Sequence, residues 1–142
     1  ILFPGMDLNC LRGNVNMSEK NLSVVLEYYD AISKKQLERA AEKLADNVQI
    51  ISPLATKNGK RDVLAALKGF SSVVENIKIT DQFASGDKVM LAYEMLFPKP
   101  IGILRAAVLI NLENGLIKRI ELFYDGQVVM SKKDDIFSSG NK

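Results

Sequence analysis

The residue whose type and position most suggest chemistry is a glutamate within an apolar strand pattern. Glu94 occupies every second position of the segment 88–97 together with Met90, Ala92 and Leu96, so these four side chains are expected on one face of the strand. A carboxylate that loses its hydration in apolar surroundings can act as a general acid or base near neutral pH. The alternative is a glutamate on the outer face of a sheet, paired across the strands with a lysine or arginine. The direction of this side chain separates the two interpretations.

Three hydroxyl side chains are further candidates. Tyr28 lies at the edge of an apolar helical stripe, where it can donate a hydrogen bond into a cavity or keep its hydroxyl in water at the rim. Ser52 stands directly before Pro53 and can bind a ligand or form a turn. Tyr124 shares a strand face with Leu122 and can line a cavity mouth or be an ordinary core tyrosine.

The composition narrows the possible chemistry. The chain of 142 residues contains no histidine, which removes the usual zinc sites, Ser–His–Asp triads and histidine acid–base catalysis. Cys10 is the only cysteine, so no internal disulfide forms and a reducing, cytoplasmic setting is favoured. The cysteine has no cationic neighbour and is expected to be inert. We therefore expect neither a metal nor an organic cofactor.

Charge and hydropathy exclude two classes of partner. The formal net charge is +2, and the lysines are scattered rather than clustered, which argues against a nucleic-acid partner. No apolar run reaches the roughly 20 residues that a membrane-spanning helix needs.

The length of the chain is typical of one domain. We expect an irregular arm over residues 1–17, a single domain over residues 18–126 and a loose tail over residues 127–142.

The order of patterns within that domain predicts its fold class. Three segments with helical periodicity come first, between Ser18 and Val74, and four strand-like segments follow between Ile77 and Tyr124. Ser18 is the expected N-cap of the first helix. Strands gathered after helices, without alternation of the two, indicate an α+β fold.

Local signals place the remaining boundaries. Ser33 with Gln36 has the spacing of a capping box for the second helix. A short strand is expected from Val48 to Ser52, followed by a loop over residues 54–60.

Two of the strand segments, 88–97 and 103–112, are apolar on both faces. One face can be covered by the helices and a cavity, whereas the other needs a separate cover, for which a second copy of the chain is the simplest choice. The sequence therefore predicts a homodimer. The residues expected on its outer face are Val89, Leu91, Tyr93 and Met95.

The layout resembles the nuclear transport factor 2-like superfamily, in particular its SnoaL-like and ketosteroid-isomerase-like branches. The similar segments are Tyr28-Tyr29-Asp30-Ala31-Ile32, Ile50-Ile51-Ser52-Pro53 before a loop that ends at Gly59, and the run 113–120 that leads to Phe123-Tyr124-Asp125. The resemblance implies a cone-shaped α+β barrel, in which three N-terminal helices pack on a strongly curved, mostly antiparallel sheet. It is weaker for function, because one fold can carry many activities.

The resemblance also implies roles for individual residues. Matching strand positions to the family turns the face of Met90, Glu94 and Leu96 toward the interior of the cone. The ketosteroid-isomerase branch has an aspartate base before the proline, where this chain has Ser52, and a tyrosine donor that matches Tyr28. Its third group, a protonated aspartate, falls near Val108, which donates nothing.

These observations lead to one expected site and three readings of it. Glu94 and Tyr28 are the expected catalytic residues, and the expected ligand-binding residues are Ser52, Met90, Leu96, Val108, Ile110, Leu122 and Tyr124. The favoured reading is a protein that binds a small apolar molecule in an apolar cavity. The alternatives are a cofactor-independent acid–base lyase or isomerase of the SnoaL-like cyclase type, and a non-catalytic dimeric interaction module.

Overall fold

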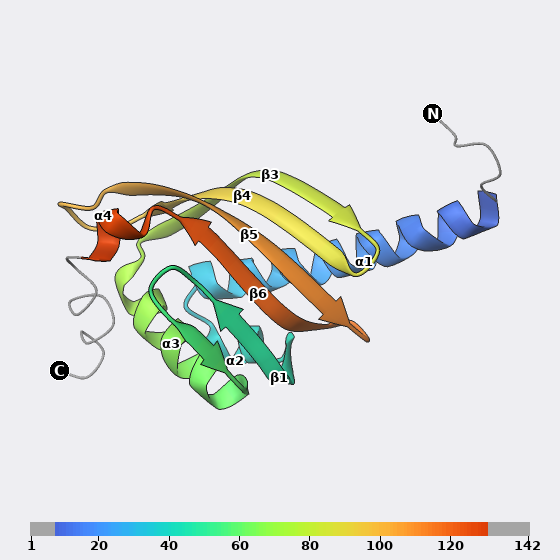
Figure 1. The fold of residues 1–142 in the computed structure, drawn as a ribbon, viewed down its shortest axis with the longest axis horizontal. Coiled ribbons are helices and arrows are strands. Elements are labelled where there is room, and N and C mark those ends of the chain that lie inside the picture. The colour runs from blue at the N-terminus through green and yellow to red at the C-terminus, as the bar shows by residue number, and fades with distance from the viewer. Residues whose placement is uncertain (1–7, 131–142) are drawn as a thin grey trace.

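A computed structural model of the chain describes residues 8–130, with side chains from residue 17 to residue 129. Helices cover one face of a six-stranded sheet (Figure 1). The helices are α1 (Leu8–Ser33), α2 (Leu37–Ala41), α3 (Lys60–Val73) and α4 (Gly126–Met130). The strands are β1 (Leu44–Ile51), β2 (Thr56–Asn58), β3 (Asn76–Ser85), β4 (Lys88–Leu96), β5 (Ile103–Glu113) and β6 (Leu116–Tyr124).

The sheet is curved and open, with strand order β2-β1-β6-β5-β4-β3. Every neighbouring pair is antiparallel except β1 and β6, which run parallel. This arrangement confirms the predicted α+β class and the curved, mostly antiparallel sheet. The sequence analysis missed β2, a short strand of exposed residues that pairs with β1 inside the expected loop.

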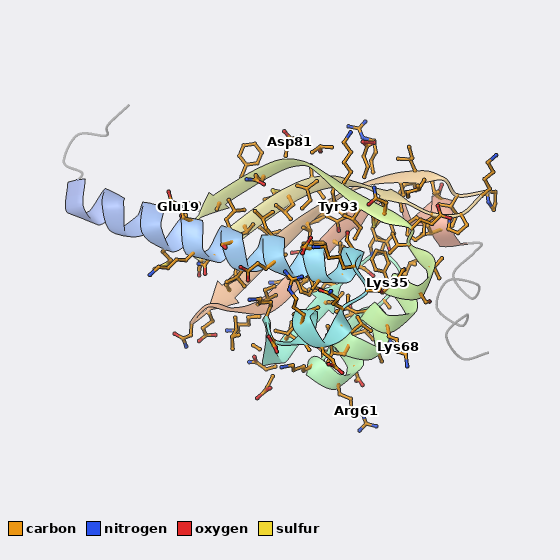
Figure 2. The ribbon with its side chains drawn as sticks, turned by 180° about the vertical axis from the view of Figure 1, so that it is seen from behind. Glu19, Lys35, Arg61, Lys68, Asp81 and Tyr93 are labelled. Atoms are coloured by element: carbon orange, nitrogen blue, oxygen red, sulfur yellow. The ribbon has the colours of Figure 1, made fainter. Side chains whose placement is uncertain are left out.

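Helix α1 crosses the covered face of the sheet, as the view from behind shows (Figure 2). Its buried stripe includes Val25, Tyr29 and Ile32, which recur at helical spacing. Two polar contacts fix it to the turn between β3 and β4. The Gly86 amide donates to Ser18 Oγ at 2.8 Å, and Asn21 Nδ2 donates to the Gly86 carbonyl at 2.8 Å.

Both ends of the predicted domain differ from expectation. The irregular arm is wrong for residues 8–17, because they belong to α1, and Ser18 is therefore inside the helix rather than its N-cap. Residues 126–130 form α4, whose Val129 is buried, so the loose tail is wrong for its first residues. The remainder of the expected arm and tail lies outside the described residues.

The connection from α1 to α2 does not use the predicted capping box. Gln36 precedes α2 but makes no side-chain capping bond to it. Instead, α1 ends with Lys35 in the left-handed conformation at φ 60°, and the Gln36 amide donates back to the Ala31 carbonyl at 2.8 Å. The Lys35 ammonium donates to the carbonyls of Ser71 and Val74, the latter at 3.1 Å, and so caps the C-terminal end of α3.

The two faces of β4 are the reverse of the expected ones. Val89, Leu91, Tyr93 and Met95 are buried under the helices, so the prediction that they form an outer dimer face is wrong. Glu94 lies on the uncovered face. Because strand side chains alternate, a shift of one position in the assumed parity exchanges the two faces completely. The charge of Glu94 was the correct local signal for the uncovered face.

No helix among the described residues is both long and apolar enough to cross a membrane.

Substitutions at Lys35 test the two roles of that residue. Lys35→Ala removes the ammonium cap but keeps a side chain in the left-handed region, so we expect the free energy of unfolding to fall by about 1 kcal/mol. Lys35→Gly loses the same cap but also relieves about 1 kcal/mol of backbone strain, so it should remain close to wild type. Urea denaturation of the three proteins measures both effects. Equal loss in the two variants would contradict the strain, and no loss in Lys35→Ala would contradict the cap.

Candidate functional site: an apolar cavity under the helices

A cavity of about 540 Å³ lies between α1, α3 and the covered face of the sheet. Its walls come from α1, β1, the 52–57 connection, α3, β4, β5, β6 and α4, so residues far apart in the sequence meet there. The lining is mostly apolar, and the buried apolar residues include Ile50, Met95, Phe97, Leu104 and Ile120. A partly enclosed apolar space of this size is typical of small-molecule sites.

The space is left open by small residues on α3. Ala65, Ala66 and Gly69 occupy the cavity-facing positions of this helix at helical spacing. Larger side chains at these positions would fill volume between the helix and the sheet. Phe70 at the end of the same face packs edge-to-face on Phe97, with ring centroids 6.0 Å apart, and completes this part of the wall.

Three buried tyrosines give the cavity its polar groups. Tyr29 lies between Tyr28 and Tyr93, with ring centroids 5.1 and 5.3 Å from theirs. The hydroxyl oxygens of Tyr29 and Tyr93 are 3.5 Å apart, a long hydrogen bond. Tyr93 lies between α1 and the sheet (Figure 2).

The Tyr28 hydroxyl is different, because it has no hydrogen-bond partner among residues 17–129. The side chain is only 1% exposed, yet no buried polar atom of the described side chains is both fully enclosed and unpaired. The hydroxyl therefore borders open space, and Tyr28 lines the cavity. It has a hydrogen to donate and two lone pairs to accept with.

Burial keeps these phenols neutral. It is the main cause of the raised pKa of Tyr28, Tyr29 and Tyr93, since removal from water disfavours the phenolate. The neighbouring Tyr93 raises the pKa of Tyr28 and Tyr29 further. At physiological pH the cavity therefore offers hydroxyl groups rather than charges.

Ser52 and Tyr124 lie nearer the opening and are half-buried. The Ser52 hydroxyl donates to the Ala55 carbonyl at 3.0 Å and accepts from the Ala55 amide at 3.2 Å, so it also forms a turn. Burial raises the pKa of Tyr124, and a hydrogen bond with Ser52 partly offsets this. The turn expected at Ser52 is confirmed, and the residue also lines the cavity, so its role in binding a ligand stays a prediction.

The charged lining residues are all exposed, and Lys68 on α3 is one of them (Figure 2). The other two are Lys57 and Asp62. Within the described part of the chain, the buried lining contains no carboxylate, and no three histidine, cysteine, aspartate or glutamate side chains are grouped as for a metal ion.

The expected site residues separate into three groups. Tyr28, Ser52, Leu122 and Tyr124 line the cavity. Val108 and Ile110 point to the covered side but are fully buried core residues that do not reach the cavity. The inward orientation expected of Met90, Glu94 and Leu96 is wrong, because they lie on the uncovered face.

The neighbours of Glu94 explain its position. In the sheet register, Glu94 is directly opposite Lys78 of β3 and Arg105 of β5. Glu94 therefore lies on the outer face beside two cations, as the alternative interpretation expected, but within residues 17–129 it makes no ion pair with either of them. Glu94 borders a shallow hollow on the uncovered face, on the opposite side of the sheet from the buried tyrosine side chains.

The sequence analysis missed Tyr29, Tyr93 and the small residues of α3. The sequence did contain a signal that Tyr93 is buried. Tyr93 shares one face of the strand with Val89, Leu91 and Met95, and none of these four residues is charged. No comparable signal marks Ala66 or Gly69, since small residues on a helix are equally common at tight packing contacts.

Comparisons with known proteins agree with this geometry. The SnoaL-like domain family matches residues 25–120, more than half of the chain. No curated protein matches the chain.

Several solved structures share the fold at low sequence identity. An NTF2-like protein of unknown function from Cytophaga hutchinsonii is 19% identical, with a TM-score of 0.70 over 78% of this chain and 94% of the other. A candidate ketosteroid isomerase from Kribbella flavida is 19% identical, with a TM-score of 0.70 over 76% of this chain and 79% of the other.

A candidate SnoaL-like polyketide cyclase from a Jannaschia species is 14% identical, with a TM-score of 0.70 over 85% of this chain and 94% of the other. At these identities the likeness concerns the fold. The match over residues 25–120, together with the curved sheet and its helical cover, establishes that this chain belongs to the SnoaL-like domain family of the NTF2-like superfamily.

Proposed function

We propose that this protein binds a small, largely apolar molecule that presents an acceptor oxygen, such as that of a ketone, to the Tyr28 hydroxyl. The observation that carries the proposal is a buried donor that has no hydrogen-bond partner within the described side chains and borders an apolar cavity of about 540 Å³. An acceptor on the ligand would satisfy this donor, while the apolar walls would remove the rest of the ligand from water.

The chemistry of the lining favours binding over catalysis. An acid–base lyase or isomerase needs a base within hydrogen-bond reach of the proton that it removes. Neutral tyrosines with raised pKa are poor bases, and the carboxylate of the described lining, Asp62, lies at the exposed rim of α3.

The enzyme alternative therefore assigns the role of base to one residue. It requires Asp62 to remove a proton from the part of a ligand that lies at the opening, with Tyr28 as the hydrogen-bond donor. The candidate cyclase and isomerase among the structural neighbours support this alternative only at the level of the fold.

We further propose that the protein acts as a homodimer in the cytoplasm, without nucleic acid or membrane as a partner. Exposed apolar side chains on the uncovered sheet face support a second copy. The single cysteine, which permits no internal disulfide, and the small net charge support the remaining parts.

A filled cavity tests the location of binding. Ala66→Leu adds apolar volume on the cavity face of α3, and we expect the dissociation constant of the naphthyl ketone prodan to rise at least about tenfold, the effect of losing about 1.4 kcal/mol. Prodan fluorescence titration measures this. Arg61→Leu is the matched control, because Arg61 is exposed on the same helix and outside the lining. Equal prodan affinity of wild type and Ala66→Leu would place binding elsewhere.

Removal of one hydroxyl tests the donor. Tyr28→Phe should weaken prodan binding by about fivefold, in line with a net hydrogen bond of about 1 kcal/mol. It should leave the affinity for the corresponding dimethylaminonaphthalene without the ketone unchanged. Because the hydroxyl has no hydrogen-bond partner among residues 17–129, the melting temperature should hardly change. A similar loss for both probes would contradict a bond to the ketone oxygen.

The buried tyrosines predict a loss of stability in alkali. Their pKa is raised in the folded state, so the folded protein keeps protons that the unfolded chain releases from about pH 10. The contribution is fully present below that pH and is lost as the pH rises toward the folded pKa. Tyr93→Phe should therefore reduce the fall in melting temperature between about pH 9 and about pH 11. Parallel profiles for Tyr93→Phe and wild type would contradict this linkage.

A further inference from the structure

The opening of the cavity carries charged side chains, whereas its buried walls carry none. Lys57, Asp62 and Lys68 line the cavity, and all three are exposed. Exposed lining residues lie where a cavity meets solvent, so these three side chains mark the opening. The buried lining within residues 17–129 is apolar apart from its tyrosine hydroxyls. The charge of the lining is therefore gathered at the end that meets water.

The pairing of β1 with β2 turns Lys57 toward the cavity. Lys57 is the register partner of Ile50, and partners in an antiparallel pair project from the same face of the sheet. Ile50 is buried and lines the cavity. The next pair along, Gln49 and Asn58, projects from the opposite face, where Gln49 Nε2 donates to Asn58 Oδ1 at 2.8 Å. The short strand β2 thus brings a lysine to the cavity side of the sheet.

Lys68 reaches the same opening from α3, where Figure 2 labels it. It follows Ala65 by three positions, so the two are neighbours on the surface of the helix, and both line the cavity. Asp62 is six positions before Lys68, which is not the spacing of three or four residues at which helical side chains meet. The two lysines of the opening therefore come from two different elements, and the helix does not pair Lys68 with its own aspartate.

None of the three charges is neutralised within the described part of the chain. Lys57, Asp62 and Lys68 make no ion pair among residues 17–129. The cations at the connection from α1 to α2 differ, because a lysine and an arginine there both pair with Asp30. Two cations and one anion leave the opening with an excess of positive charge. Such an opening attracts a ligand that carries a negative charge.

We propose that the ligand of this cavity is an amphipathic carboxylate, such as a keto acid, whose carboxylate lies at the opening with Lys57 and Lys68. This inference rests on the binding function proposed above and names the class of its ligand. The carbonyl oxygen at the other end of the molecule accepts a hydrogen bond from Tyr28, and the apolar body occupies the space between. The carboxylate stays in contact with water, so the cost of burying a charge does not arise.

The distribution of polar groups also fixes the direction in which this ligand lies. A carboxylate placed against the buried walls would lose its hydration and meet no cation there. The opposite orientation gives an acceptor to the Tyr28 hydroxyl and an anion to the two lysines. A neutral ketone can still bind in the cavity, but it gains nothing from the charges at the opening.

A matched pair of probes tests the anionic end. Prodan carries its ketone and its dimethylamino group at opposite ends of a naphthalene ring. Replacing one N-methyl group by carboxymethyl gives a derivative with a carboxylate at the end away from the ketone. Fluorescence titration gives the ratio of the dissociation constant of this derivative to that of prodan, in which changes of the apolar cavity cancel. The ratio should rise between ionic strengths of about 0.01 M and about 1 M, because salt screens the lysines.

Replacement of the lysines tests the contact itself. Lys57→Gln and Lys68→Gln together should raise the ratio by about fivefold, whereas Asp62→Asn should lower it, because that variant removes the negative charge of the opening. The double variant with Lys20→Gln and Lys88→Gln is the matched control. Both lysines are exposed and outside the lining, and their loss changes the net charge equally, so the ratio should stay as in wild type. Thermal melting of each variant shows whether its fold is retained.

The possible failures are distinguishable. An unchanged ratio in the variant that lacks Lys57 and Lys68, with prodan binding still weakened by Ala66→Leu, would overturn the carboxylate but not the proposed binding function. An equal rise of the ratio in the control variant would overturn the local contact at the opening. Affinities for both probes that Ala66→Leu leaves unchanged would overturn the cavity as the binding site, and the carboxylate class with it.

Discussion

The contact between Tyr29 of α1 and Tyr93 of β4 sets the separation of the helical layer from the sheet. The two rings lie with centroids 5.3 Å apart, and their hydroxyls meet at 3.5 Å. Large aromatic side chains at this point hold α1 away from the sheet, and the small residues of α3 do not fill the space beside them. Close packing elsewhere in the core makes this combination significant, because a protein interior normally closes such a gap.

The same alternation of side chains gives the sheet two different faces. Along β4, every second side chain is uncharged and faces the helices, and two of these, Tyr93 and Met95, form part of the cavity wall. The side chains between them face the uncovered side and include Glu94, whose direct neighbour there is Arg105 of β5. A neutral, donor-bearing interior and a charged, partly apolar exterior therefore arise from one strand. The first suits the uncharged body of a ligand, and the second suits another copy of the chain.

Much of this architecture could be predicted from the sequence, because the boundaries of β3 to β6 and α3 depend on local periodicity and turn residues. Tyr28, Ser52, Leu122 and Tyr124, which were expected in the site, line the cavity, and their roles toward a ligand stay predictions. The resemblance could not show which face of β4 turns toward the helices. At such low sequence identity the alignment of a strand can be wrong by one residue, and a shift of one residue exchanges its two faces. The local charge of Glu94 carried that information.

Other features depend on tertiary context. Helix α1 begins at Leu8, ten residues before Ser18, which the sequence analysis took as its N-cap. The Ser18 hydroxyl accepts a hydrogen bond from the Gly86 amide in the β3–β4 turn. The cavity itself depends on the small size of Ala65, Ala66 and Gly69 on one face of α3. In a sequence, small residues at helical spacing predict an open space and a tight packing contact equally well.

A crystal structure of the full chain grown with prodan tests the central claim most directly. The account predicts density for the probe between α3 and β4, with its ketone oxygen within about 3.2 Å of the Tyr28 hydroxyl. An interior filled by its own side chains, or density for the probe only in the shallow hollow beside Glu94 on the uncovered face, would contradict it.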